Sequence, residues 1–532
     1  MPADLLLRGG AILTLDPHLP RARSLAVSDG RIAAVGATGD ELDALRGPQT
    51  RVIDLDGRAL VPGFVDAHLH FTSFALSREQ VDLDAAATLE DGLAAVRQAH
   101  TTLPAGAWVR GRGWDRNRWG RLPTAADLDA VLGERPAALS SHDGHALWLN
   151  GAALRVVGIT AETSAPAGGV IERDEHGAPT GVLFENAQDL VRRGLPAPSV
   201  DELTAAVRRA LPVAAAAGLT GLHNFEDSRS RQAFQALEAA GELSLRVYHG
   251  VPRGTLREGP PPELRTGQGD GLVRIGPVKL FADGALGSRT AFLLAPYEGR
   301  TDGYRGVPTL EPEQLREDMR LAAEAGLDLA VHAIGDAAVR SVLDAYAVAR
   351  HTCPPLRERL LRIEHAQLVH PDDVPRFRQL GVIASMQPIH AIADWRTADA
   401  HWGARARDGY AWRALLDAGA TLAFGTDAPV ERLEPLASLH AAVTRQTPDG
   451  QPAGGWYPHQ RVSLEEAVRA YTAGSAVAER ATERRGSLRV GNDADLVVLG
   501  PDPFGRAPAV LPETRVELTV VAGRIVYEGA GR

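Results

Sequence analysis

Six residues along the chain have side chains that bind metal ions or carry protons in enzymes. They are His68, His70, Lys279, His332, His365 and Asp427. Neutral imidazoles and a carboxylate are ligands for zinc and similar divalent ions, and three or four such ligands leave a coordination position for water. Any one of these histidines alone is better explained as a hydrogen-bonded core residue, but the six together form a chemically coherent set.

Lys279 is the only lysine among the 57 lysine and arginine residues of the chain. A salt-bridging cation could equally be arginine, whereas only a buried lysine can lose its proton and become a nucleophilic amine. Such an amine can add carbon dioxide to form a carbamate, whose two oxygens can bridge two metal ions. A pair of ions about 3.5–4 Å apart activates a water and polarises a carbonyl at once.

An unmodified Lys279 would give a different site. Four of the five other candidates, His68, His70, His332 and Asp427, would then hold a single ion. A mononuclear site of this kind still permits hydrolysis or deamination, because one ion with an open position can activate a water. The sequence therefore leaves the number of ions open.

The six residues fall in or beside short apolar stretches that predict buried strands. In "DAHLH" (66–70), alternation along a strand points both imidazoles to one face. Amphipathic stretches rich in Ala, Leu and Arg lie between most of the strands, which predicts a (β/α)8 TIM-type barrel. The six side chains would then meet at the C-terminal mouth, where active sites of this fold lie. The predicted strands are 61–70, 220–225, 244–251, 276–284, 328–336, 360–368, 381–388 and 421–430.

Both ends of the chain differ from this middle region. Residues 1–60 and 478–532 consist of short apolar stretches separated by turn signals, which is typical of hairpins. We expect them to form one small β-sandwich domain beside a barrel that covers 61–477. The first two barrel strands are separated by far more chain than a crossover needs, so residues from about 75 to 200 are predicted to form an inserted subdomain. It is either a substrate-shaping cover or a structural insert.

Five further residues are weaker candidates. His142 and His145, in "SSHDGHALWLN", would either reach the substrate or form hydrogen bonds within the insert. Trp114 would either line the pocket or anchor packing. Arg289, in "GSRTA", would bind a substrate carboxylate through a forked contact or form a structural salt bridge. Asp66 precedes the first candidate ligand by two residues and is a candidate to orient it.

Composition and charge narrow the functional classes. The formal net charge is −10, the pI is near 6.0 and no basic run occurs, so neither nucleic acid nor an acidic membrane surface is an expected partner. The single cysteine, Cys353, excludes an intrachain disulfide and a cysteine-based zinc cluster. No apolar run reaches the length of a membrane span, and the N-terminus predicts a strand, so we expect a cytoplasmic protein. The sequence permits a homo-oligomer and does not decide the oligomeric state.

Five motifs, in chain order, carry a family resemblance. They are "VDAHLH", "VKLFADG", "LAVHAIGD", "RIEHAQ" and "FGTDAP". With "VPGFVDAH" at the entry to the barrel and "GSLRVGNDADLVVL" at its exit, the chain resembles the amidohydrolase superfamily. "DGALGSRTA" and the insert with "SSHDGHALWLN" are similar to the branch around N-substituted formamide deformylase, also called amidohydrolase family 3. The resemblance covers nearly the whole chain.

The resemblance implies a metal-dependent hydrolase of amide or formamide C–N bonds other than peptide bonds, acting on a small-molecule amide. It implies two divalent ions per chain, with zinc the expected metal. Asp427 would also take the proton of the attacking water and pass it to the leaving nitrogen. The alternatives are a mononuclear deaminase or cyclic-amide hydrolase, and a non-catalytic barrel that acts as a scaffold. The implied ligands are His68, His70 and Asp427 for one ion, His332 and His365 for the other, and carboxylated Lys279 as the bridge.

Overall fold

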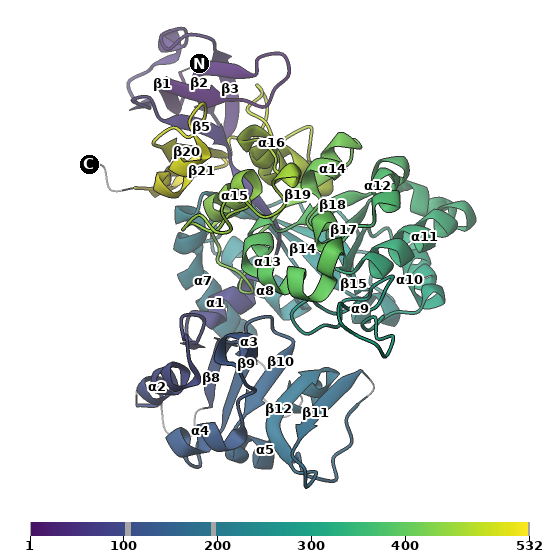
Figure 1. Cartoon of the computed structure of the whole chain (residues 1–532). Coiled ribbons are helices and arrows are strands. Elements are labelled where there is room, and N and C mark those ends of the chain that lie inside the picture. The colour runs from purple at the N-terminus through teal and green to yellow at the C-terminus, as the bar shows by residue number, and fades with distance from the viewer. Residues whose placement is uncertain (1, 102–107, 167, 193–197, 530–532) are drawn as a thin grey trace. The chain divides into compact units, whose positions relative to one another are not determined.

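The computed structural model describes residues 2–101, 108–166, 168–192 and 198–529 (Figure 1). The chain divides into two compact units. The first comprises Met1–Phe71 and Val207–Arg532, and the second comprises Thr72–Ala206. All six candidate metal-site residues belong to the first unit, so the site can be described within that unit alone.

The first unit contains a sheet of eight parallel strands that pair in chain order. The strands are β6 (Phe64–Leu69), β13 (Leu219–Asn224), β14 (Arg246–Pro252), β15 (Val273–Phe281), β16 (Leu329–Ala333), β17 (Leu361–His365), β18 (Ile383–Met386) and β19 (Thr421–Phe424). Every residue of β6, β16 and β17 is buried, as expected for parallel strands covered on both faces. This sheet is the predicted TIM-type barrel, with its strands in the predicted order.

Helices follow the strands from β13 onward. They include α8 (Ser228–Ala239), α9 (Arg253–Glu258), α10 (Pro312–Glu324), α11 (Asp336–Thr352), α12 (Val374–Leu380), α13 (Pro388–Trp402), α14 (Trp412–Asp417), α15 (Pro435–Thr444) and α16 (Leu464–Arg469). In α10 the buried apolar residues are Leu315, Met319, Ala322 and Ala323, which form one stripe at helical spacing. Such stripes explain why the Ala- and Leu-rich segments form the outer layer of the barrel.

The first and last barrel strands meet through backbone hydrogen bonds just beyond the end of β19. The Asp427 N–H donates to the His68 carbonyl at 2.7 Å, and the His70 N–H donates to the Ala428 carbonyl at 2.8 Å. Gly425 makes this approach possible, because a Cβ at this position would lie 2.6 Å from the backbone nitrogen of His68. The loop after β19 is thereby held against the end of β6.

A second sheet in this unit combines strands from both ends of the chain (Figure 1, purple and yellow). Its strands are β1 (Leu5–Leu13), β2 (Arg21–Ser28), β3 (Arg31–Gly36), β4 (Arg51–Asp54), β5 (Ala59–Pro62), β20 (Leu496–Gly500), β21 (Arg515–Val521) and β22 (Arg524–Glu528). The predicted strand at 61–70 is divided, because β5 pairs with β1 and β20 in this sheet while β6 joins the barrel.

The second unit, Thr72–Ala206, has its own six-stranded sheet. The sheet order is β11 (Gly169–Arg173), β12 (Pro179–Glu185), β10 (Ala146–Leu149), β9 (Ala137–Ser141), β8 (Val109–Trp114) and β7 (Val81–Asp82). The helices α2 (Leu89–His100), α4 (Ala125–Leu132) and α5 (Gly151–Val157) complete it, and Trp114 and Trp148 lie in its core. The unit therefore has a hydrophobic core of its own.

Replacing Gly425 with alanine tests the barrel closure. The new Cβ would collide with the His68 backbone and the Asp66 carboxylate, so we expect a loss of about 1–3 kcal/mol of stability, seen as a lower melting temperature in calorimetry. Gly254→Ala is the matched control, because a Cβ there meets nothing within 4 Å and alanine favours its helix, α9. Equal melting temperatures for the two variants would contradict the close-approach argument.

Candidate metal centre

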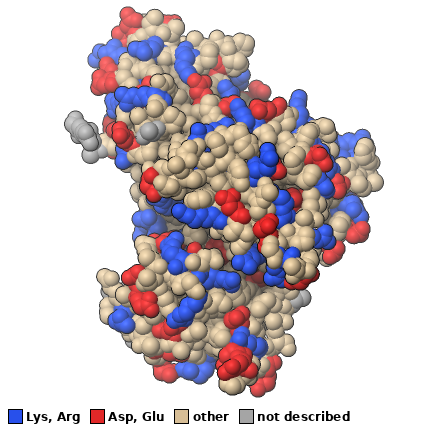
Figure 2. Space-filling view, in the orientation of Figure 1, with Lys and Arg blue, Asp and Glu red and all other residues tan. Residues whose placement is uncertain are grey.

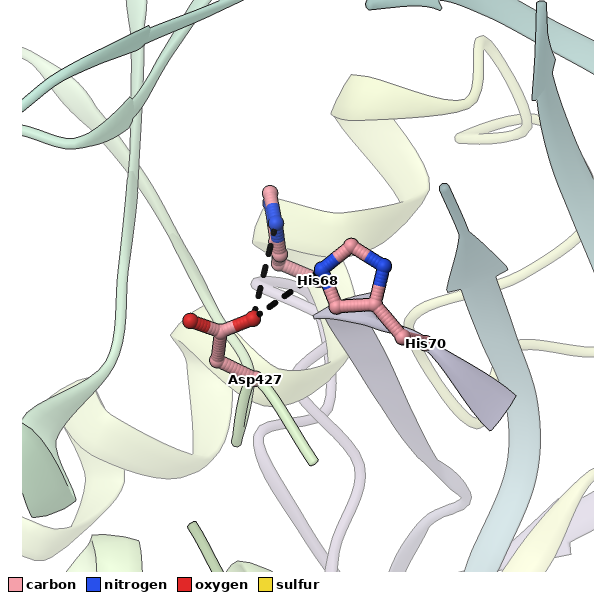
Figure 3. Close-up of side chains that lie close together, drawn as sticks. All are labelled: His68, His70 and Asp427. Atoms are coloured by element: carbon pink, nitrogen blue, oxygen red, sulfur yellow. Dashed lines mark ion pairs between the residues drawn. The ribbon is translucent and has the colours of Figure 1, made fainter. Parts of the chain in front are cut away.

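Asp427 is the centre of a cluster of buried and partly buried histidines at the barrel mouth. It lies three residues beyond β19 in a left-handed backbone conformation (φ 61°). Its Oδ1 atom is 3.4 Å from His70 Nε2 and 3.7 Å from His68 Nε2 (Figure 3). His68 lies in β6 and His70 directly follows this strand, and both imidazoles face Asp427, in line with the alternation in "DAHLH". These ligand atoms converge on one point.

The other carboxylate oxygen of Asp427 faces a second pair of histidines. Oδ2 is 3.9 Å from His365 Nδ1 and 3.8 Å from His390 Nε2. His365 ends β17, whereas His390 is the third residue of α13. His390 was not among the residues predicted from the strand ends, because it lies in a helix. The available signal was "QPIH", which places a histidine in the first turn of a helix directly after a barrel strand.

The rings of His68 and His70 are fixed by hydrogen bonds at Nδ1. His68 Nδ1 lies 2.6 Å from Glu364 Oε2, and His70 Nδ1 lies 2.9 Å from the Phe225 carbonyl. An N–H at Nδ1 that donates to these acceptors leaves the lone pair on Nε2, which is the atom that faces Asp427. Burial, followed by the nearby positive charge of Lys279, lowers the pKa of His68 to about 4, so this ring is neutral.

Glu364 belongs to a buried charge network inside the barrel, which the sequence analysis also missed. The Arg362 guanidinium donates to Glu364 Oε1 at 2.7 Å and to Ser385 Oγ at 2.8 Å, and it lies 2.6 Å from His223 Nδ1. Burial opposes ionisation of Glu364, but Arg362 and His68 hold its pKa well below the usual value. The sequence feature that could have revealed this network is the pair of Arg362 and Glu364, two charged residues that lie two positions apart in an apolar strand.

Asp66 has a different role from the one predicted for it. Its carboxylate accepts hydrogen bonds from the backbone N–H of His68 at 3.1 Å and from the Thr426 hydroxyl at 2.6 Å. These bonds reach the backbone of His68 and the side chain of Thr426, and not the imidazole ring. The carboxylate that orients this ring is Glu364, whereas Asp66 ties the end of β6 to the loop after β19.

Lys279 lies beside the first histidine pair. Its Nζ atom is 3.2 Å from His68 Nε2 and 5.0 Å from the centroids of the Phe225 and Phe281 rings. The side chain is buried, and this burial lowers the pKa of Lys279 to about 8, although the negative charges of Glu364 and Asp427 oppose the shift. A substantial fraction of the amine is therefore neutral in weakly alkaline solution.

His332 is close to the cluster but has other contacts. Its ring centroid is 4.6 Å from that of His365, while its Nε2 lies 2.9 Å from the Gly284 carbonyl and 3.5 Å from Asp283 Oδ1. In the described part of the chain, two groups bring His and Asp ligand atoms within 4.8 Å of one another. They are His68, His70 and Asp427, and His365, His390 and Asp427, so neither includes His332.

These residues fit a divalent metal ion. Within the described ranges, Asp427 Oδ1 and His390 Nε2 are buried and have no hydrogen-bond partner. Burial opposes ionisation of Asp427, but His70, His68 and His365 hold its pKa well below the usual value. An ionised carboxylate surrounded by imidazole nitrogens is a donor set that zinc prefers, and an ion would satisfy the two orphaned atoms.

The weaker histidine candidates lie in the second unit, where each faces a carboxylate. His142 Nδ1 is 2.8 Å from Asp84 Oδ1, and His145 Nδ1 is 3.0 Å from Glu185 Oε2. These are the contacts within the insert that the sequence analysis gave as the alternative to substrate binding. In both cases the carboxylate fixes the ring orientation, as it does at His68.

The last two candidates differ in exposure. Trp114 is buried in the core of the second unit, and its indole N–H donates to the Leu139 carbonyl at 2.8 Å, so its position is that of a packing residue. Arg289 is exposed, has a left-handed backbone (φ 61°) and directs its Nε toward His401 Nε2 at 3.1 Å. Neither belongs to the two ligand groups around Asp427.

Comparisons with known proteins identify the family of this chain. The chain matches the model described as "Amidohydrolase family" over residues 51–527. It is 34% identical to "Putative amidohydrolase YtcJ" of Bacillus subtilis (strain 168), with 98% of each chain covered. It is 30% identical to "N-substituted formamide deformylase" of Arthrobacter pascens, with 99% of each covered.

A solved structure is similar to this chain in fold. An uncharacterized metal-dependent hydrolase from Pyrococcus horikoshii OT3 has a TM-score of 0.76 and is 28% identical, covering 98% of this chain and 100% of that chain. The resemblance noted in the sequence motifs is therefore confirmed over the length of the protein. The chain belongs to the amidohydrolase family and is a metal-dependent hydrolase.

Proposed function

We propose that this chain hydrolyses the C–N bond of an N-substituted formamide or a similar small amide, with two zinc ions and a carboxylated Lys279. Family membership makes it a hydrolase of C–N bonds. The observation that carries the finer proposal is the position of Lys279 Nζ, 3.2 Å from His68 Nε2 within the ligand cluster. An ammonium at this point would repel a divalent ion, whereas a carbamate would bind it.

A bound divalent ion supplies a Lewis acid that polarises the amide carbonyl and lowers the pKa of a water. Asp427 is placed to act as the base, because its Oδ1 is buried and accepts no hydrogen bond from the described residues. Its lowered pKa keeps this carboxylate ionised. Asp427 then passes the proton of the water to the leaving nitrogen, which departs as a neutral amine.

The proposed carbamate explains how one lysine can serve two ions. In this proposal His68, His70 and Asp427 would hold the first ion, and carboxylated Lys279 would supply one oxygen donor to each ion. Carboxylation replaces the positive charge of Lys279 with a negative group that has two oxygen donors. The close approach of the His332 and His365 rings, 4.6 Å between centroids, supports a second position beside the first.

Phe281 supports an apolar substituent on the substrate nitrogen. It follows Lys279 by two residues on β15, so both side chains point to the same face of the strand. Phe281 is 49% exposed although Lys279 and His332 beside it are buried, and its ring centroid is 5.3 Å from that of His332. An exposed ring beside the metal ligands is a surface on which an aryl or alkyl group can pack.

The proposed partner is a small molecule rather than a macromolecule. On the face shown in Figure 2, positive and negative side chains are interspersed, which does not favour nucleic-acid binding. In the described residues, no helix has both the length and the apolar character needed to cross a bilayer.

Lys279→Arg tests the role of the amine. Arginine keeps the positive charge but cannot be carboxylated, so we expect kcat/KM for formanilide to fall by at least about 100-fold, measured as aniline release. The bound zinc should fall as well, because a bridging group is lost. Acetate or propionate added to Lys279→Ala should restore part of the activity by supplying a carboxylate. Full activity of the arginine variant would refute the bridging role.

A panel of substrates distinguishes the reaction classes. Formanilides and N-acyl amines test amide hydrolysis, hydantoins test cyclic-amide hydrolysis, and aminated heterocycles test deamination. Only deamination releases ammonia from an exocyclic nitrogen. Ammonia release combined with a single bound ion would replace the present proposal with the mononuclear deaminase.

Carboxylation of Lys279 should depend on pH. The reacting form is the neutral amine, so carboxylation of the metal-free protein should accelerate as pH rises through about 8 and then level off. Below this pH the ammonium predominates and cannot add carbon dioxide. We would measure incorporation of labelled carbon dioxide by mass spectrometry from pH 6.5 to 9.5 at a constant concentration of dissolved carbon dioxide. A rate independent of pH would contradict the lowered pKa.

Phe281→Ala tests the aryl-binding surface. We expect kcat/KM for formanilide to fall about tenfold, as for the loss of about 1.4 kcal/mol of ring packing, with little change for N-methylformamide. Val348→Ala is a control, because Val348 is also half-exposed but lies on α11 outside the cluster. An equal loss for both substrates would indicate a general structural effect.

A further inference from the structure

We propose that Asp283 is a positioning residue that fixes the ring of His332 for metal binding. This inference rests on the ligand role that the proposed function gives to His332. Asp283 follows the end of β15 by two residues, and His332 lies in β16, the neighbouring barrel strand. The Asp283 carboxylate itself binds neither the ion nor the substrate. It acts through the His332 ring and the turn beside it.

The contacts of His332 Nε2 determine which ring nitrogen can bind an ion. Nε2 lies 2.9 Å from the Gly284 carbonyl oxygen and 3.5 Å from Asp283 Oδ1. Because a carbonyl oxygen only accepts hydrogen bonds, Nε2 carries the proton. The lone pair is then on Nδ1, which becomes the metal-binding atom. A neutral imidazole that donates its other N–H to a carbonyl or carboxylate is the usual form of a metal-bound histidine.

The Asp283 carboxylate holds the Gly284 carbonyl in place. Its Oδ1 accepts a hydrogen bond from the Ile334 N–H at 3.0 Å, and its Oδ2 accepts from the N–H groups of Gly335 at 2.8 Å and Phe292 at 2.9 Å. Ile334 and Gly335 directly follow β16, whereas Phe292 lies in the segment between β15 and α10. One buried carboxylate therefore joins this segment to the end of the strand that carries His332.

Close packing leaves the turn at Asp283 and Gly284 little freedom. The Ala282 N–H donates to the His332 carbonyl at 2.8 Å, which extends the pairing of β15 with β16 up to Asp283. A Cβ at Gly284 would lie 2.0 Å from Thr290 Oγ1 and 2.5 Å from Thr290 Cβ, so the turn has no space for a side chain there. The Gly284 carbonyl is therefore held at the His332 ring by the backbone on one side and the Asp283 carboxylate on the other.

Asp336 provides a matched comparison. It is also buried, and it accepts a hydrogen bond at 2.9 Å from the N–H of Leu294, two residues beyond Phe292. Both carboxylates therefore anchor the same segment to the barrel. Asp336 begins α11, whereas Asp283 lies beside the His332 ring. Loss of the Asp336 carboxylate should loosen the segment, and loss of the Asp283 carboxylate should in addition disturb the metal-binding imidazole.

Zinc affinities of matched full-length variants, measured by competition with a chromophoric chelator, test the inference. His332→Gln first identifies the ion that His332 holds. Asp283→Asn replaces one carboxylate oxygen with an amide donor, which then faces either the His332 ring or two backbone N–H groups. We expect this variant to bind that same ion about 10–100-fold more weakly and any other ion as wild type does. Asp336→Asn is the control and should keep wild-type affinity even if its melting temperature falls.

Three outcomes would overturn the inference. They are wild-type zinc affinity in Asp283→Asn, wild-type affinity in His332→Gln, and an equal loss of affinity in Asp283→Asn and Asp336→Asn, which would attribute the effect to the anchored segment alone. The readout depends neither on turnover nor on the number of ions. Failure to hydrolyse any amide would therefore refute the proposed function, and a single ion in wild type would refute its two-ion form, while the expected affinity pattern would still support this inference.

The tautomer of His332 keeps the test valid if Asp283→Asn does not fold. Nitrogen NMR of the metal-free wild-type protein with isotope-labelled histidine distinguishes a proton on Nε2 from one on Nδ1, and the His332 signals are those absent from His332→Gln. We expect the proton on Nε2 in wild type and in Asp336→Asn, and a partial shift to Nδ1 in a folded Asp283→Asn. A proton on Nδ1 in the wild-type protein would overturn the inference, because Nδ1 could then not bind the ion.

Discussion

The backbone hydrogen bonds between the end of β6 and the loop after β19 are the constraint on which the site depends. They hold Asp427 and His68 in adjacent positions although the two residues come from opposite ends of the barrel sequence. Gly425 permits this distance because it has no side chain to separate the two segments. If the first and last strands moved apart, the carboxylate would lose both histidines of β6 at once. Barrel closure and assembly of the metal centre are therefore the same event.

Charges inside the barrel determine the chemical state of the ligands. The ion pair of Arg362 and Glu364 is almost fully buried, and burial of such a pair is costly unless its hydrogen bonds are satisfied. Here Ser385 and His223 complete the contacts of the guanidinium, and His68 completes those of the carboxylate. This arrangement supplies an ionised acceptor behind a neutral imidazole. The network therefore fixes the orientation of the His68 ring.

The sequence predicted the barrel and the residue types at its mouth but not all of their partners. Apolar strands alternating with amphipathic helices identified the eight strands, and the polar residues at their ends identified His68, His70 and Asp427. Sequence patterns do not specify which carboxylate lies behind a ring, so Glu364 was missed and Asp66 was chosen instead. His390 was missed because its helical position depends on where β18 ends and α13 begins. The hydrogen bond of His332 to Gly284 depends on loop geometry, which periodicity does not describe.

The separation of Asp427 from His68 along the chain has a consequence for biosynthesis. The histidines of β6 emerge from the ribosome long before β19 is made, and on their own they offer an ion only two imidazoles. The carboxylate that both histidine pairs face arrives near the end of translation. A nascent chain that lacks β19 therefore lacks the carboxylate that both histidine pairs face, so the ligand set is complete only after the last barrel strand has been made.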